Sequence, residues 1–226
     1  MAGSCERVDV VAEFDERAPR YDTSAVHRWQ ARQAAELACL QWRGSAVVPR
    51  ADTCGPTAPA LPFRAEVFDV VICVAAIAYL GDAVTALRES RRVCRPGARL
   101  VLSVPANGGI PSFALLREAA RAHGVALSEP NAGLGDEDTR RSVLGSAGLL
   151  CDGVVERTFA EPLAGDSRST AEHFISHGHA EPLRVAPREV RERVYATYRD
   201  SFVQQQQNGT GHHTVLYVRC RAPGAT

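Results

Sequence analysis

Residues 61–104 constrain the fold more than any other part of the chain. Phe68–Val74 is a continuous apolar run rich in β-branched residues, which is typical of a strand covered on both faces in a parallel sheet. Apolar residues recur at helical spacing over residues 82–94, and Pro96 and Gly97 are expected to end that helix. Residues 100–104 form a second apolar run. This order predicts a strand, a crossover helix and a neighbouring parallel strand.

Further elements are expected on both sides of this unit. Residues 24–40 contain few helix breakers and predict an N-terminal helix. Residues 42–62 contain four prolines and two glycines, which leave room for one short strand, at residues 45–48. Downstream, the sequence predicts helices at 111–123, 136–147 and 187–202, a short helix opened by a capping box at 169–172, strands at 149–159 and 214–220, and a polar loop at 204–211.

Composition favours one domain and excludes several kinds of function. A chain of 226 residues that is 45% hydrophobic can bury one core, divided here into a segment 1–41, a Pro-rich loop 42–62 and a core 63–226. The 26 basic residues balance 26 acidic ones, so we expect no nucleic-acid or membrane partner. Every basic residue is Arg, and the lack of Lys excludes Schiff-base chemistry and a Walker-type phosphate loop.

The cysteines and the N-terminus indicate a cytoplasmic protein. Seven cysteines are scattered along the chain, odd in number and never in C-x-x-C spacing, which is typical of reduced, buried thiols. The first twenty residues contain acidic residues and no apolar core of signal-peptide length, and no 18-residue apolar run follows. The excess of Ala, Arg, Gly and Val is typical of a GC-rich bacterial genome.

Residues 61–104 resemble the second half of a class I S-adenosylmethionine-dependent methyltransferase, of the small-molecule, type 11-like kind. The matching positions are scaffold positions: the FDVV run at 68–71, Glu89, Arg92, Val93, Pro96 and Gly97. The F-D-x-x-A-x-x-Y-D pattern at 14–22 resembles the helical lid that precedes the core in that family. The resemblance implies an α/β, reduced Rossmann-like methyltransferase fold, with a mostly parallel sheet, an antiparallel C-terminal strand pair and an N-terminal helical lid.

The family's cofactor-binding positions are not matched. In that family a strand and a Gly-rich turn wrap the methionine and ribose, and an acidic residue on the next strand binds the ribose hydroxyls. Residues 42–60 contain no G-x-G turn and are fewer than the roughly 30 that one βαβ unit needs. Thr57 stands where the family's acidic adenine-binding residue is usual, and Ala78 and Tyr79 replace a common His or polar residue. We therefore expect the cofactor-binding half to be missing internally and no bound cofactor.

Four residues are candidates to line a substrate site. Tyr79 and Asp82 follow the central strand, where open α/β sheets place their ligands. Tyr79 could orient a substrate oxygen as a catalytic residue, or pack beneath the N-terminal helix. Asp82, together with Tyr21 and Asp22 of the lid segment, is a candidate substrate-binding residue.

A histidine cluster is the other candidate site. His173, His177 and His179 form an H-x3-H-x-H pattern, and His173 and His177 would share a helical face one turn apart. No further ligand lies at tight spacing beside them, so we expect no metal site. His173 and His177 are instead catalytic candidates able to move a proton near neutral pH, or an incidental cluster. His212 and His213 lie near the terminal strand.

Three functions are compatible with these observations. The first is a natural-product tailoring enzyme that has lost methyl transfer and acts on a small-molecule substrate as a cofactor-free cyclase or isomerase. The second is a methyltransferase that binds S-adenosylmethionine in an atypical way. The third is a non-catalytic partner subunit. Loss of early strands would expose one edge of Phe68–Val74, so we expect a homodimer, or a heterodimer with a related enzyme, to cover what residues 42–62 leave open.

Overall fold

The computed structural model describes residues 24–39, 46–47, 61–80 and 82–224. Within these residues the chain builds a five-stranded sheet of order β1-β2-β3-β5-β4. Its strands are Ala46–Val47 (β1), Phe68–Val74 (β2), Cys94–Pro105 (β3), Leu150–Pro162 (β4) and Thr210–Arg221 (β5). β1, β2 and β3 are parallel, whereas β3 with β5 and β5 with β4 are antiparallel. The α/β class and the antiparallel C-terminal strand pair are therefore confirmed, in a sheet of mixed direction.

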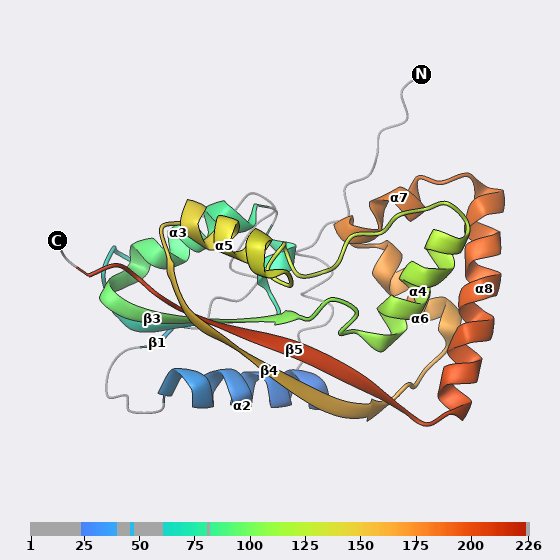
Figure 1. Ribbon diagram of the computed structural model, residues 1–226, viewed down its shortest axis with the longest axis horizontal. Helices are drawn as coiled ribbons and strands as arrows, with labels where there is room; N and C mark the ends of the chain where they lie inside the picture. Colours follow the sequence, from blue (N-terminus) through green and yellow to red (C-terminus); the bar gives the residue numbers. More distant parts are fainter. Residues whose placement is uncertain (1–23, 40–45, 48–60, 81, 225–226) are drawn as a thin grey trace, which may run out of the picture.

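Helices cover both faces of this sheet (Figure 1). α2 (Ala25–Cys39) lies on one face, and α3 (Ala83–Val93) and α5 (Glu137–Ser146) lie on the other. The alternation of side chains along β5 explains how one strand serves both layers. Val215 and Tyr217 share a core cluster with residues of α2, whereas Leu216 and Val218 belong to the core on the α3 and α5 face.

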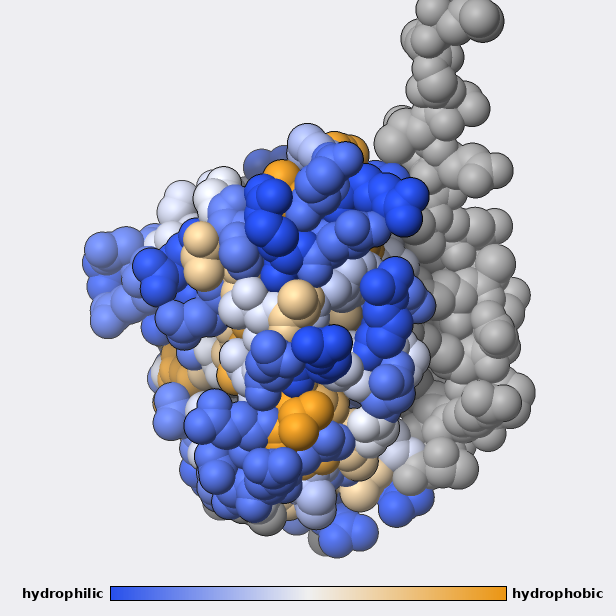
Figure 2. Space-filling view, turned by 90° about the vertical axis from the view of Figure 1, so that its right-hand side faces the viewer, coloured by the Kyte–Doolittle hydropathy of each residue, from blue (hydrophilic) through white to orange (hydrophobic). Residues whose placement is uncertain are grey.

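A second group of helices packs at one end of the sheet, where β4 and β5 extend beyond the parallel strands (Figure 1). It contains α4 (Pro111–Ala122), α6 (Ser167–Ile175), α7 (Glu181–Arg184) and α8 (Arg188–Gln207), with the short 3-10 helix η3 (Gly178–Ala180). Phe113, Leu116, Val194, Tyr198 and Phe202 form its core. Figure 2 views the molecule from this end, and its surface is mostly hydrophilic with isolated hydrophobic residues.

The predicted crossover is confirmed. β2 has the predicted bounds, and α3 connects it to its parallel neighbour β3. β3 is longer than expected because it begins at Cys94 and includes Pro96 and Gly97, which were expected to form a turn. Gly97 has a φ of +76°, and the register of β2 against β3 shifts between Phe68 and Val70. The Pro-Gly pair is thus accommodated within an irregular stretch of the strand.

Two predicted helix boundaries were also wrong. α6 begins at Ser167, not at the proposed capping box, because the Asp166 carboxylate caps it and accepts from the Ser169 N–H at 2.8 Å. α8 continues through Gln207, where a polar loop was expected, because Gln is a good helix former and a polar run can extend a helix on its solvent side. The short strand expected at 45–48 is confirmed as β1, which pairs with Val70 and Val71.

Parts of the other expectations lie outside the described residues. These include the lid pattern at 14–22 with Tyr21 and Asp22, and Thr57. In the part of the chain that is described, no helix combines the length and the hydropathy needed to span a bilayer.

Candidate functional site

A cavity of about 330 Å³ lies at the carboxyl ends of β2 and β3. Ala75, Ile77 and Tyr79 line it from the loop after β2 and its 3-10 helix η2 (Ile77–Tyr79), and Ser103 and Pro105 line it from β3. α2, α4, α6, β5 and the loops that precede α4 and α5 contribute the remaining described walls. This is where open α/β sheets place their ligands, and the volume falls within the range of small-molecule sites, about 300–1,000 Å³.

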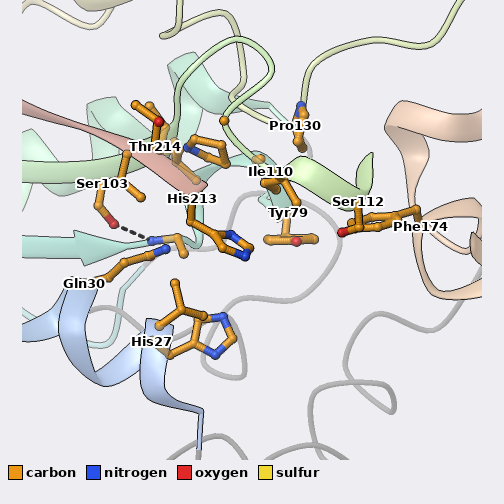
Figure 3. Close-up of a pocket in the computed structure, with 18 of the residues that line it drawn as sticks. His27, Gln30, Tyr79, Ser103, Ile110, Ser112, Pro130, Phe174, His213 and Thr214 are labelled. Carbon is orange, nitrogen blue, oxygen red and sulfur yellow. Dashed lines mark hydrogen bonds between the residues drawn. The ribbon is translucent and has the colours of Figure 1, made fainter. Parts of the chain in front are cut away.

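Directly after β2 the backbone adopts a left-handed conformation, which turns the chain toward this cavity. Ala75, directly after β2, has a φ of +49°, which is unusual for a residue with a Cβ. Its N–H donates to the Ser103 carbonyl at 3.1 Å and to the Ser103 Oγ at 2.9 Å, and Figure 3 marks the bond to the hydroxyl. Ser103 is fully buried. Two bonds from β3 therefore hold a conformation that is costly by itself, and they direct η2 and Tyr79 toward the cavity.

Three histidines from three different elements line the cavity: His27 of α2, His173 of α6 and His213 of β5. The His213 ring lies between Tyr79 and the end of α2 in Figure 3. Burial lowers the pKa of His213, and Glu161, whose Oε2 lies 3.6 Å from Nε2, opposes that effect. His213 is therefore mainly neutral at pH 7 and can accept a proton.

The cavity lining is nearly free of formal charge. Among the described residues that line it, none is Asp, Glu or Arg, and the polar ones are His, Tyr, Ser, Thr and Gln. Ile77, Ile110, Phe174 and Val215 supply apolar surface. An uncharged, partly apolar molecule would lose least solvation on entering such a cavity.

Tyr79, His173 and His177 lie together. The Tyr79 and His177 ring centroids are 5.2 Å apart, and those of His173 and His177 are 4.8 Å apart. α6 ends at Ile175, so the expectation that both histidines share one helical face was wrong, and His177 reaches His173 from the turn that follows the helix. His177 is 6% exposed and is not among the described cavity-lining residues.

Hydrogen bonding determines the tautomer of His177. Its Nδ1 lies 2.7 Å from the His173 carbonyl oxygen, which can only accept, so Nδ1 carries the proton. In the neutral form of this ring, Nε2 is then an acceptor. On its other side His177 stacks on His179 with a centroid separation of 5.4 Å. Burial, and then the charge of His177, lower the pKa of His179 to about 4.

Asp82 lies at the start of α3. Its carboxylate accepts from the N–H groups of Val84 at 3.1 Å and Thr85 at 3.3 Å, and from the Thr85 hydroxyl. The bond from the Thr85 hydroxyl is the main cause that lowers its pKa. Asp82 is absent from the described lining of the cavity, and these contacts are those of a helix N-cap.

Metal ligation has no support in the described residues. Among them no group of three or more His, Cys, Asp or Glu side chains could hold a metal ion, and this includes the three-histidine cluster.

Sequence reasoning missed His27, Gln30, Ser103 and His213 as members of the site. The alternation of side chains along β5 could have identified His213, because residues 213, 215 and 217 share the face of β5 that packs on α2. Helical spacing could have identified His27 and Gln30, because both lie on the same face of α2 as the buried Ala34. Ser103 sits in an apolar run and carries no such signal.

Comparison with known proteins agrees with this architecture. A family model described as "Methyltransferase domain" matches residues 10–102. A chain of the complex between the Haloferax volcanii Trm112 methyltransferase activator and a methyltransferase superposes with a TM-score of 0.53 at 15% identity, over 96% of this chain and 99% of that chain. The family model covers less than half of the chain, and the superposition shows that the chain has the methyltransferase fold.

Two other solved structures match this chain at lower similarity. A SAM-dependent methyltransferase from Thermotoga maritima has a TM-score of 0.47 at 14% identity, over 92% of this chain and 97% of that chain. The [4+2]-cyclase SpnF has a TM-score of 0.36 at 16% identity, over 74% of this chain and 54% of that chain. A search of curated proteins finds no match.

The described residues of this methyltransferase-fold cavity do not fit S-adenosylmethionine well. That molecule carries a sulfonium, an ammonium, a carboxylate and a ribose diol, and buried charges need partners of opposite charge. The described lining supplies neither a carboxylate nor a guanidinium. The sequence of residues 42–60 also lacks the G-x-G turn with which the family binds the cofactor.

Proposed function

We propose that this protein is a small-molecule enzyme of the methyltransferase fold that catalyses a cofactor-free proton transfer, as in an isomerisation or a cyclisation, in the cavity at the carboxyl ends of β2 and β3. The observation that carries the proposal is the lining of that cavity. Proton-transfer groups from several elements, with His213 mainly neutral at pH 7, surround an apolar space whose described lining contains no Asp, Glu or Arg.

The proposed step uses His213 and Tyr79. The neutral imidazole of His213 takes a proton from a carbon next to a substrate carbonyl, and the electron pair moves onto the carbonyl oxygen. The Tyr79 hydroxyl donates a hydrogen bond to that oxygen. The imidazolium then returns its proton to a different carbon, which completes an isomerisation with no other reactant. Glu161, 3.6 Å from His213 Nε2, stabilises the imidazolium while it exists.

His173 and His177 have different roles in this proposal. His173 lines the cavity and is the second residue able to exchange a proton with the substrate. His177 packs its ring against the rings of both Tyr79 and His173, so we assign it a positioning role. Tyr21, Asp22 and Asp82 remain proposed substrate-binding residues, with Asp82 the least favoured because its carboxylate caps α3.

The test uses 5-nitrobenzisoxazole, a probe that opens its ring when a base removes one proton. A general base contributes about 10²-fold or more to such a step. We expect His213→Gln to lower turnover about 100-fold. His212→Gln is the matched control, because His212 is the exposed neighbour on the other face of β5.

Turnover no faster than that given by free imidazole at the same concentration would contradict the proposal. Equal turnover by the wild type and His213→Gln would contradict the role of His213. Circular dichroism of each variant separates a loss of chemistry from a loss of folding.

S-adenosylmethionine-dependent methyl transfer is the second candidate, and the family-model match over residues 10–102 favours it. Calorimetric titration with S-adenosylmethionine distinguishes the two. The uncharged lining predicts no saturable binding with a Kd below about 10 μM, which corresponds to roughly 7 kcal/mol. Tighter binding would support the methyltransferase and count against a cofactor-free enzyme.

A partner subunit remains part of the proposal. β1 pairs with only Val70 and Val71 of β2 among the described residues, so its coverage of that edge is short. One structure of similar fold is a methyltransferase solved with an activator subunit. We propose a homodimer, or a heterodimer with a related enzyme, through this edge. Light scattering that gives a monomer mass at tens of micromolar would contradict the homodimer.

A further inference from the structure

Gln30 is a buried amide whose oxygen has no hydrogen-bond partner among the described residues. The residue is 9% exposed, lies in the second turn of α2 and lines the cavity. Its Oε1 is buried and unpartnered in this part of the chain. Its backbone carbonyl has a separate contact, a long one of 3.5 Å from the Tyr217 hydroxyl. Buried polar side chains nearly always have a partner, so an orphan in a cavity indicates a partner that arrives with a ligand.

No described neighbour of Gln30 donates to this oxygen. Ser103, across the cavity, accepts the Ala75 N–H with its Oγ at 2.9 Å. In Figure 3 the end of the Gln30 side chain points toward Ser103, at the carboxyl end of β3. His213 lines the same cavity. A ligand bound in the cavity would therefore contact Gln30 and the proposed base together.

We propose that Gln30 binds a hydroxyl or N–H group of an uncharged substrate. This inference rests on the proposed function for the identity of the site and adds the class of substrate. An amide oxygen can only accept, so the ligand group must be a donor. A cationic donor would enter a cavity whose described lining contains no carboxylate, which strongly disfavours it. The substrate is thus a neutral, partly apolar molecule with a hydroxyl or amide group near the reacting carbon.

The test compares two probes that differ only in a hydroxyl, 2-naphthol and naphthalene, by equilibrium binding to the full chain. We expect the wild type to prefer 2-naphthol about tenfold, or 1.4 kcal/mol. Gln30→Met has nearly the same shape without the amide, and it should reduce this preference to about one. Gln33→Met is the matched control on the same helix, because the Gln33 side chain bonds to Glu36 at 3.0 Å.

A wild type that binds both probes equally would overturn the inference, as would a preference that survives in Gln30→Met. The melting temperature gives a separate readout. Removing an orphaned amide should raise it by about 2–4 °C, whereas a residue kept for structure would lower it. If Gln30→Met does not fold, the preference for 2-naphthol over naphthalene is measured on Gln30→Leu and on the wild type, and the same outcomes apply.

The hydroxyl preference and the turnover of 5-nitrobenzisoxazole are independent measurements, so the role of Gln30 and the proposed function can fail separately. Turnover of 5-nitrobenzisoxazole without a hydroxyl preference would refute the role of Gln30 and leave the proton-transfer enzyme. A hydroxyl preference without turnover would refute the enzyme and leave a binding site in which Gln30 recognises the donor.

Discussion

His179 should make the stability of this protein depend on pH between about 6.5 and 4. Its ring lies between Phe113, at 4.8 Å, and His177, at 5.4 Å, and its Nε2 is buried without a partner among the described residues. Burial, then the charge of His177, lower its pKa from 6.5 to about 4. Below pH 6.5 the unfolded chain therefore binds more protons at this residue than the folded chain, and the free energy of unfolding falls as the pH falls.

The size of the effect follows from that difference in pKa. At 1.36 kcal/mol per pKa unit, the fall from 6.5 to about 4 corresponds to about 3 kcal/mol. For a chain of this length 1 kcal/mol shifts the melting temperature by about 2–4 °C, so the full effect is about 6–12 °C. The stability is present above pH 6.5 and is lost as the pH falls to about 4.

Thermal unfolding at pH 7.5 and 4.5 of the wild type and His179→Phe checks this. Phe keeps an aromatic ring against Phe113 and His177 but cannot bind a proton. The variant should lose less stability between the two pH values than the wild type, by most of those 6–12 °C. A smaller slope should remain, because burial also lowers the pKa of His213. His212→Phe, at an exposed position, is the control and should follow the wild type. Parallel curves for the wild type and His179→Phe would refute the reasoning.

Two further predictions concern local structure. A Cβ at Gly109 would lie 2.2 Å from the Thr214 carbonyl oxygen, so Gly109→Ala should lower the free energy of unfolding by about 3 kcal/mol or more. Gly145→Ala, in a helix where a Cβ meets nothing within 4 Å, should raise it by about 1 kcal/mol, and denaturant melts compare the two. Asp82→Ala should lower the melting temperature by about 2–4 °C and Asp82→Asn much less, since Asn also caps helices. Equal losses would show that the cap is not the main role of Asp82.

The central crossover was predictable because local and tertiary signals agree there. The apolar run of β2 is buried on both faces, so nothing in its pattern conflicts with its place between β1 and β3. The start of α6 was mispredicted because Asp166 and Ser169 are both good caps, and the choice depends on which one the preceding chain presents. The end of α8 was missed because a polar run of Gln is compatible with either a loop or an exposed helix.

The site was only partly predictable. The position after β2 follows from a general property of open sheets, and this property found Tyr79. The pattern H-x3-H-x-H drew attention to His173 and His177, but only tertiary packing brings those rings beside Tyr79. Gln30 and His213 lie far apart in the sequence. They line the same cavity because β5 pairs with β3 and α2 packs against β5.

The choice between proton transfer and methyl transfer depends on the cavity lining more than on the fold. The positions that match the family are scaffold positions, and a scaffold of this kind can support more than one chemistry. A sulfonium cofactor brings a permanent positive charge, which needs a carboxylate or an oriented array of carbonyl groups to replace its hydration. The described lining offers imidazoles, a phenol and hydroxyls, which are suited to moving a proton on a neutral molecule. The uncharged cavity therefore favours proton transfer, and the titration with S-adenosylmethionine is the measurement that would reverse this conclusion.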